Sequence, residues 1–115
     1  RREIAERYFE AFRGLPLGLP EEQTYARAVY HLFVVRHERR AAFMAAMNER
    51  GVGTAVHYPV TLHLQGAFAS LGGKRGDRKV AERAADQIVS LPVYPELSDA
   101  QVGAVIAAVK EAVNA

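Results

Sequence analysis

The sequence predicts an α/β (α+β) fold, with a small, antiparallel sheet of about three strands and helices packed mainly on one face. The prediction comes from the order of two patterns, because short β-branched runs alternate with segments whose apolar residues recur at helical spacing. Composition agrees with a folded chain, since half of the 115 residues are apolar and the formal net charge is only +2. A chain of this length buries roughly two thirds of its unfolded surface, which is enough for one core. We therefore expect a single domain over residues 1–115.

Four segments have the apolar spacing of amphipathic helices, namely residues 1–13, 38–50, 77–87 and 98–113. After the second segment, Gly51 stands where a left-handed residue often ends a helix. Asp77 is expected to cap the third helix. Ser98 and Gln101 have the spacing of a capping box at the start of the fourth. In the third helix, the apolar stripe expected to face inward consists of Val80, Ala81, Ala84 and Ile88. In the fourth helix, it consists of Val102, Val105, Ile106, Val109 and Val113.

Three short segments rich in β-branched or aromatic residues predict the strands, and these are residues 28–36, 52–57 and 88–91. The first is apolar almost throughout, which is typical of a strand with little exposure on either face. Pro59 and Pro92 limit the second and third strands, because proline has no N–H to donate to a neighbouring strand. Residues 60–76 are irregular, with a short helix expected around 64–71 and a glycine-rich loop after it.

Several classes of protein are excluded by what the composition lacks. The sequence has no cysteine, so it has no disulfide framework and no thiolate nucleophile or metal ligand. Its small excess of positive charge does not indicate a nucleic-acid partner, which requires a clustered basic face. Its longest apolar run is far shorter than the ~20 residues that span a bilayer, and no signal-peptide pattern is present. We therefore expect a cytoplasmic protein with no nucleic-acid or membrane partner.

The most unusual segment is His57-Tyr58-Pro59-Val60-Thr61-Leu62-His63, which places two imidazoles and a phenol directly after a strand. Polar side chains at strand ends often form sites. The alternative is a Tyr-Pro turn whose histidines cap nearby carbonyl groups. A metal site is not expected, because His57 and His63 are separated by a predicted loop with no acidic residue between them.

The second candidate is the glycine-rich loop Gly72-Gly73-Lys74-Arg75-Gly76. Glycines let the backbone approach an anion, and the two cations supply charge. The spacing differs from that of a phosphate-binding P-loop, and no strand leads directly into the segment. A solvated, flexible loop is therefore the favoured interpretation.

Several single residues predict structure rather than chemistry. His31 is expected to be a satisfied core or interface histidine, whereas His37 is expected to be exposed before a helix. Met44 and Met47 have helical spacing and are expected in the core. The three lysines lack the apolar surroundings that activate a lysine, and no serine lies in a nucleophile motif. No catalytic residue is therefore expected in this chain.

A series of short motifs is informative in combination. The motifs are Tyr30–Arg36 (YHLFVVR), Arg50–Thr54 (RGVGT), His57–Pro59 (HYP), Leu62–Gln65 (LHLQ), Val80–Glu82 (VAE) and Ser90–Leu97 (SLPVYPEL). In this order they resemble the C-terminal domain of the DegT/DnrJ/StrS-type sugar aminotransferases. The likeness covers residues 1–113, and the HYP-x-x-LH and SLP-x-YPEL segments are specific in combination.

Members of that family are pyridoxal-phosphate (PLP) enzymes of the aspartate aminotransferase fold (fold type I). They convert a keto-sugar, usually linked to a nucleoside diphosphate, into an amino-sugar, with glutamate or glutamine as the amino donor. Their chains are several times longer, and a large N-terminal domain holds PLP and the lysine that forms its Schiff base. The resemblance therefore implies that this chain, which starts at Arg1, is the small C-terminal domain of a homodimeric parent. It implies no activity and no bound PLP for the chain alone.

By match of motif, the resemblance implies that His57 and Tyr58 bind the nucleotide-sugar substrate, with His63 a weaker third. One departure is Arg78-Lys79, where the family commonly has proline before its Val-Ala-Glu helix. Three alternatives stay open. In the first, the chain is a stand-alone binding or regulatory module. In the second, it is an oligomerisation element that uses the helix at 1–13. In the third, it is a fragment of a PLP-dependent sugar dehydratase of the same lineage.

Overall fold

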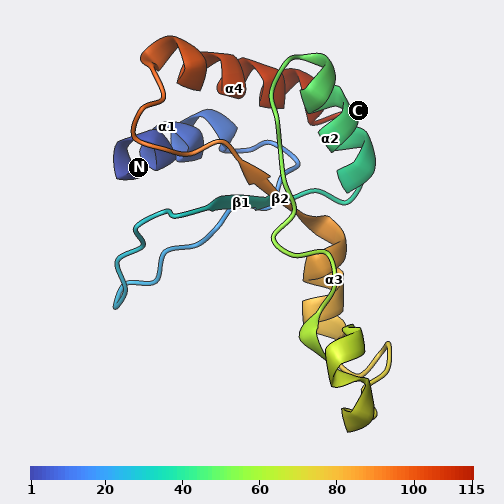
Figure 1. Ribbon diagram of the computed structural model, residues 1–115. Coiled ribbons are helices and arrows are strands. Elements are labelled where there is room, and N and C mark those ends of the chain that lie inside the picture. Colours follow the sequence, from blue (N-terminus) through green and yellow to red (C-terminus); the bar gives the residue numbers. More distant parts are fainter.

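Helices and strands surround one core, and two longer segments extend away from it (Figure 1). The computed structural model describes residues 1–115. The elements in order are α1 (Arg2–Phe12), β1 (Phe33–Arg36), α2 (Arg40–Glu49), the short 3₁₀ helices η1 (Leu62–Leu64) and η2 (Gly66–Leu71), α3 (Lys79–Gln87), β2 (Ile88–Leu91) and α4 (Asp99–Ala112). The helices α1, α2 and α4 lie on one side of the strands, whereas α3 extends away on the other (Figure 1). None of the helices has the length and apolar character needed to cross a bilayer.

The sheet consists of β1 and β2, which pair antiparallel with Phe33 opposite Leu91. The predicted combination of helices with a small antiparallel sheet is confirmed, but the sheet has two strands rather than about three. The predicted strand at 52–57 is reduced to one bridge between Ala55 and Ser90. It extends no further because the chain turns away at the HYP motif, where proline cannot donate to a neighbouring strand.

The first strand is also shorter than expected, because residues 28–32 do not pair with β2. Tyr30 has a φ of +50°, a left-handed conformation that interrupts extended backbone. Its hydroxyl donates to Glu22 (3.0 Å), and the same carboxylate accepts from the Ala28 amide (2.9 Å). This part of the aromatic run is therefore held by side-chain hydrogen bonds rather than by a strand ladder.

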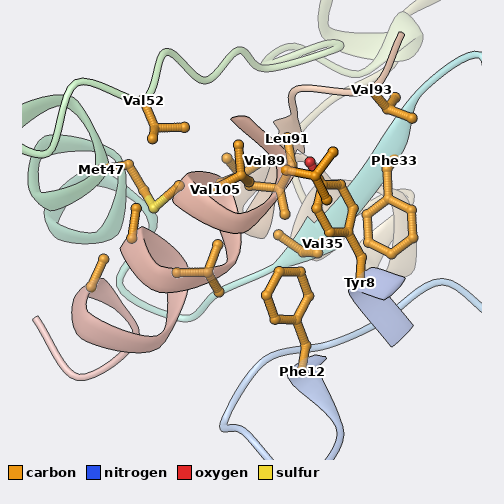
Figure 2. Close-up of a cluster of buried hydrophobic side chains, with 14 of the residues drawn as sticks. Tyr8, Phe12, Phe33, Val35, Met47, Val52, Val89, Leu91, Val93 and Val105 are labelled. Carbon is orange, nitrogen blue, oxygen red and sulfur yellow. The ribbon is translucent and has the colours of Figure 1, made fainter. Parts of the chain in front are cut away.

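The core forms where α1 packs against the sheet and α4 (Figure 2). Tyr8, Phe12 and Phe33 are completely buried, and the Tyr8 ring meets Phe33 edge-on with 5.2 Å between centroids. Aromatic side chains of this size each bury about 150–250 Å², so they supply much of the apolar area of this core. The Tyr8 hydroxyl donates to the Pro92 carbonyl oxygen (2.7 Å), which satisfies the polar end of the ring.

The fourth helix has the predicted start and the predicted buried face. Ser98 Oγ accepts from the Gln101 amide (3.1 Å), and the Gln101 side chain accepts from the Ser98 amide (2.9 Å), so the capping box is confirmed. In α2, Met47 is buried and Met44 is partly buried, and Gly51 follows with a φ of +74° as expected. Of the stripe predicted for this helix, Ile106 is only partly buried. The other four residues are buried, and these are Val102, Val105, Val109 and Val113.

The prediction for His37 was wrong, and of the two alternatives for His31, core or interface, the core one was wrong. His37 is buried rather than exposed, because its ring stacks on Phe43 with 4.9 Å between centroids and both ring nitrogens have backbone partners. His31 is exposed rather than in the core, because the chain around Tyr30 turns away from the sheet. Only its backbone carbonyl is engaged, by the Arg1 guanidinium at 3.0 Å.

Residues 58–87 form an arm that carries η1, η2, a loop and α3 (Figure 1). This arm and the long loop between α1 and β1 make the molecule elongated, with extents of 48 × 36 × 26 Å (Figure 1). The radius of gyration is 15.5 Å, against about 13 Å for a compact domain of this length. Large apolar side chains are exposed along this arm, namely Tyr58, Val60, Leu62, Phe68, Leu71 and Val80.

The predicted inward stripe of α3 was wrong, since Val80 is 84% exposed and Glu82 and Ala85 are the buried residues. The reason is that α3 lies outside the core, so its apolar side has no sheet to cover. Asp77 does not cap the helix, because its carboxylate accepts from the Lys74 amide (2.9 Å) in the preceding loop. The helix begins one residue after Arg78 without a side-chain cap.

Candidate functional site

His57 lies where the chain leaves the bridge to β2, and it is half-buried. Its Nδ1 atom is 2.8 Å from the hydroxyl of Ser90, a buried residue of β2. If that hydroxyl donates, the neutral imidazole carries its hydrogen on Nε2, which no protein group engages. The rigid strand therefore orients a histidine that has one hydrogen-bonding position left for a ligand.

Tyr58 follows across a cis peptide bond and is 72% exposed. Its ring stands edge-on to that of His57, with 5.4 Å between centroids and 84° between planes. The phenol hydroxyl has no partner within the protein. Tyr58 thus presents an apolar ring and a free hydroxyl at the base of the arm.

An open hollow of about 520 Å³ separates the HYP segment from α3. Tyr58 and His63 contribute to its lining from one side. Ala81 and Ala84 of α3 and Ile88, the first residue of β2, line it from the other side, so most of the apolar stripe predicted for the core is found here. The structure therefore brings Tyr58 and His63 to one hollow, whereas His57 faces Ser90 and does not line it.

His63 lies in η1, and only 16% of its side chain is exposed. Its Nε2 atom is 3.5 Å from Oε2 of Glu82, which is too long for a good hydrogen bond, and the atom has no other partner. This histidine is therefore placed by its surroundings but retains hydrogen-bonding capacity.

The glycine-rich loop does not contribute cations to this hollow. Lys74 is exposed, and Arg75 pairs with Asp86 of α3 at 3.1 Å with both side chains largely in solvent. Exposed pairs of this kind contribute about 0–1 kcal/mol. The charged side chains of the loop are therefore solvated, as favoured from the sequence.

Two residues next to the site were missed by the sequence reasoning. Ser90 supports His57, and its only signal is that it is the one polar residue in the apolar strand IVSL. Glu82 approaches His63, and nothing in the local pattern distinguishes it from a solvated helix residue. Both belong to the motifs VAE and SLPVYPEL noted above.

Comparison with known proteins defines the class to which this fold and segment belong. The model of the DegT/DnrJ/EryC1/StrS aminotransferase family matches residues 1–110, and the chain belongs to this family. This confirms the resemblance drawn from the motifs.

Among characterised relatives, a dTDP-3-amino-3,4,6-trideoxy-alpha-D-glucose transaminase from Streptomyces venezuelae is 40% identical over 112 residues, which are 96% of this chain and 30% of the relative. The erythromycin biosynthesis sensory transduction protein EryC1 from Saccharopolyspora erythraea is 38% identical over 111 residues, again 96% of this chain and 30% of the relative. The chain thus spans about 30% of the length of these relatives.

The same part of a solved structure has the same fold. The crystal structure of S. venezuelae DesV in complex with a ketimine intermediate superposes with a TM-score of 0.94 at 38% identity. The match covers 99% of this chain and 31% of that one. The fold is therefore that of an aminotransferase domain.

Proposed function

We propose that residues 1–115 are the small C-terminal domain of a PLP-dependent sugar aminotransferase. The parent enzyme converts a nucleotide-linked keto-sugar into an amino-sugar, takes its amino group from glutamate or glutamine, and works as a homodimer. The family match over residues 1–110 carries this proposal, and the length of the relatives supports the assignment to one domain. The name of the S. venezuelae relative supports a dTDP-linked sugar as the substrate class.

We further propose that His57, Tyr58 and His63 are the substrate-binding residues of this domain. A sugar nucleotide offers hydroxyl and phosphoryl oxygens, which accept hydrogen bonds from imidazole N–H and phenol O–H groups, and its hydroxyl groups also donate to an unprotonated imidazole nitrogen. The Tyr58 ring and the apolar side of α3 offer a surface for the less polar face of a sugar or base. These groups supply binding and orientation, and none of them is assigned a bond-making role.

The cofactor is held elsewhere in the parent enzyme. When bound, PLP would supply an electron sink for the carbon that carries the amino group. A lysine that holds such a cofactor covalently is activated by apolar surroundings or a cationic neighbour. Lys74, Lys79 and Lys110 are all exposed, so the residues of this chain do not fit that requirement.

Titration of a nucleoside-diphosphate sugar into the 115-residue chain tests the binding role. Because one domain offers only part of a site, we expect a Kd of about 1 mM or weaker. A Kd of about 1 mM corresponds to a binding free energy of about −4 kcal/mol. His57→Ala weakens this binding severalfold, whereas His31→Ala, which changes an exposed histidine outside the segment, leaves it unchanged. Micromolar binding by the chain alone, or equal binding by both variants, would contradict the proposal.

An absorbance scan with added PLP tests the cofactor assignment. We expect no saturable, stoichiometric chromophore from a cofactor–lysine bond, because no lysine is buried. A saturable chromophore lost in one lysine variant would contradict it.

A regulatory module is the second candidate, and the specific observation that favours it is the name of EryC1, a sensory transduction protein. Tight binding of the nucleotide sugar by the chain alone, without turnover, would favour this candidate over an enzyme fragment.

A further inference from the structure

Glu82 is the only acidic side chain buried in this protein, although it lies on the exposed arm. It is 6% exposed, and its neighbour Val80 on the same helix is among the most exposed apolar residues. Burying a carboxylate is costly unless hydrogen bonds compensate it. The compensation comes mainly from the backbone of the preceding loop.

Two amides donate to the Glu82 carboxylate. Oε1 accepts from the Gly76 amide at 2.7 Å, and Oε2 accepts from the Arg78 amide at 3.0 Å. The hydrogen bond from Gly76, above all, holds the pKa of Glu82 below its ordinary value against the opposing effect of burial, so the side chain is charged at neutral pH. The loop is thereby fastened to α3 by its own backbone.

The loop also encloses His63. A Cβ atom added to Gly73 would lie 2.8 Å from the His63 carbonyl oxygen, so the backbone at Gly73 passes directly over this residue. On its other side, the Nε2 atom of His63 lies 3.5 Å from Oε2 of Glu82. No other polar group lies within hydrogen-bonding distance of this buried nitrogen, so the Glu82 carboxylate is the acceptor nearest to it.

We propose that Glu82 is a positioning residue that fixes the ring hydrogen of His63 on Nε2. A carboxylate is an acceptor only, so the nitrogen that faces it carries the hydrogen. The other ring nitrogen, Nδ1, then accepts a hydrogen bond from a ligand hydroxyl. Glu82 also holds the 72–78 loop around His63, since this end of the arm has no hydrophobic core of its own.

The identity of that ligand rests on the proposed function and is a hydroxyl of the nucleotide-linked sugar. The tautomer and the loop geometry do not rest on it, because they follow from contacts within the chain. The positioning of His63 by Glu82 and the binding of a sugar hydroxyl are therefore tested by separate measurements on the same sample.

The first readout is the tautomer of His63, measured by long-range ¹H–¹⁵N NMR on the 115-residue chain near pH 8. We expect the Nε2–H form in the wild-type protein. In Glu82→Gln, the side-chain NH₂ group replaces one carboxylate oxygen. This donor then faces another donor, which is either a backbone N–H of the loop or the Nε2–H of His63. We expect loss of the single tautomer and hydrogen exchange at Gly76 and Arg78 at least about tenfold faster.

Asp86→Asn is the matched control, because Asp86 lies one turn further along α3 and is exposed. It should leave the tautomer and both exchange rates unchanged. A predominant Nδ1–H form in the wild-type protein overturns the proposal without reference to any variant. Equal effects of Glu82→Gln and Asp86→Asn also overturn it.

The second readout is the nucleotide-sugar titration. If Glu82 positions His63 for the substrate, Glu82→Gln weakens binding by about the same factor as His63→Ala, and the double variant is no weaker than either. Unchanged binding in Glu82→Gln contradicts the positioning role. Absence of binding in the wild-type protein contradicts the proposed function instead, because the tautomer is measured without ligand.

Discussion

The Nε2 atom of His37 lies 2.7 Å from the carbonyl oxygen of Val113, which is 76 residues further along the chain. On the other side of the ring, Nδ1 accepts from the Arg39 amide at 3.0 Å. The neutral imidazole is therefore a donor at Nε2 and an acceptor at Nδ1. It connects the end of α4, where carbonyl groups lack helical partners, to the turn that starts α2.

Replacing His37 with phenylalanine tests this connection. The ring stack on Phe43 is retained, but the Val113 carbonyl and the Arg39 amide lose their partner. An unsatisfied buried polar group costs about 1–3 kcal/mol, so we expect stability to fall by about 2 kcal/mol and the Tm by roughly 6–10 °C. Calorimetry or urea unfolding measures the change. His31→Phe is the control and should stay within about 0.5 kcal/mol; equal effects would show that His37 is not structural.

Tyr8 predicts how stability depends on alkaline pH. Burial raises the pKa of Tyr8 from 10.0 to about 12. The folded state therefore retains this proton more tightly than the unfolded state, and the resulting stability is present below pH 10 and lost as the pH rises toward 12. We expect the Tm of Tyr8→Phe to fall less over this interval than that of the wild-type protein. Parallel Tm curves would contradict the assignment.

Gly73→Ala tests the enclosure of His63 by the loop. The added Cβ would meet the His63 carbonyl oxygen at 2.8 Å, so either the loop or η1 must move. We expect shifted amide signals for His63 and its neighbours, with little change in the signals of the core. Gly53→Ala is matched in chemistry but has open space around it. Identical spectra for Gly73→Ala and the wild-type protein would show that the loop yields without effect.

The two apolar helix stripes predict opposite outcomes. Val109 of α4 is completely buried, so Val109→Ala removes core packing and should cost about 2–3 kcal/mol. Val80 of α3 is exposed, so Val80→Ala should change stability by less than about 0.5 kcal/mol. Urea unfolding of both variants compares them directly. A large loss for Val80→Ala would mean that α3 packs into the core in solution.

These helices also show what the sequence could predict. For α4 the capping box and the valine spacing both follow from local chemistry, and the structure confirms them. For α3 the same kind of spacing predicted an inward stripe that is in fact turned toward the HYP segment. Periodicity identifies an apolar side of a helix but does not say which surface covers it.

In the candidate site, too, the local segment was predictable from the sequence, whereas its long-range contacts were not. The HYP segment was recognised because polar side chains follow a strand, and Tyr58 and His63 do share a hollow. Its supports, Ser90 and Glu82, lie 33 residues from His57 and 19 from His63 along the chain, and only the fold brings them together. Spacing within a segment could not have predicted these contacts.

The most direct test of the central claim is an amide chemical-shift map of the chain during titration with a nucleoside-diphosphate sugar. We expect weak, saturable changes centred on residues 57–63 and on Ser90, with α1 unaffected and with loss of the changes in His57→Ala. Saturable changes confined to other surfaces, or none at concentrations well above about 1 mM, would contradict the claim that this domain contributes substrate-binding residues.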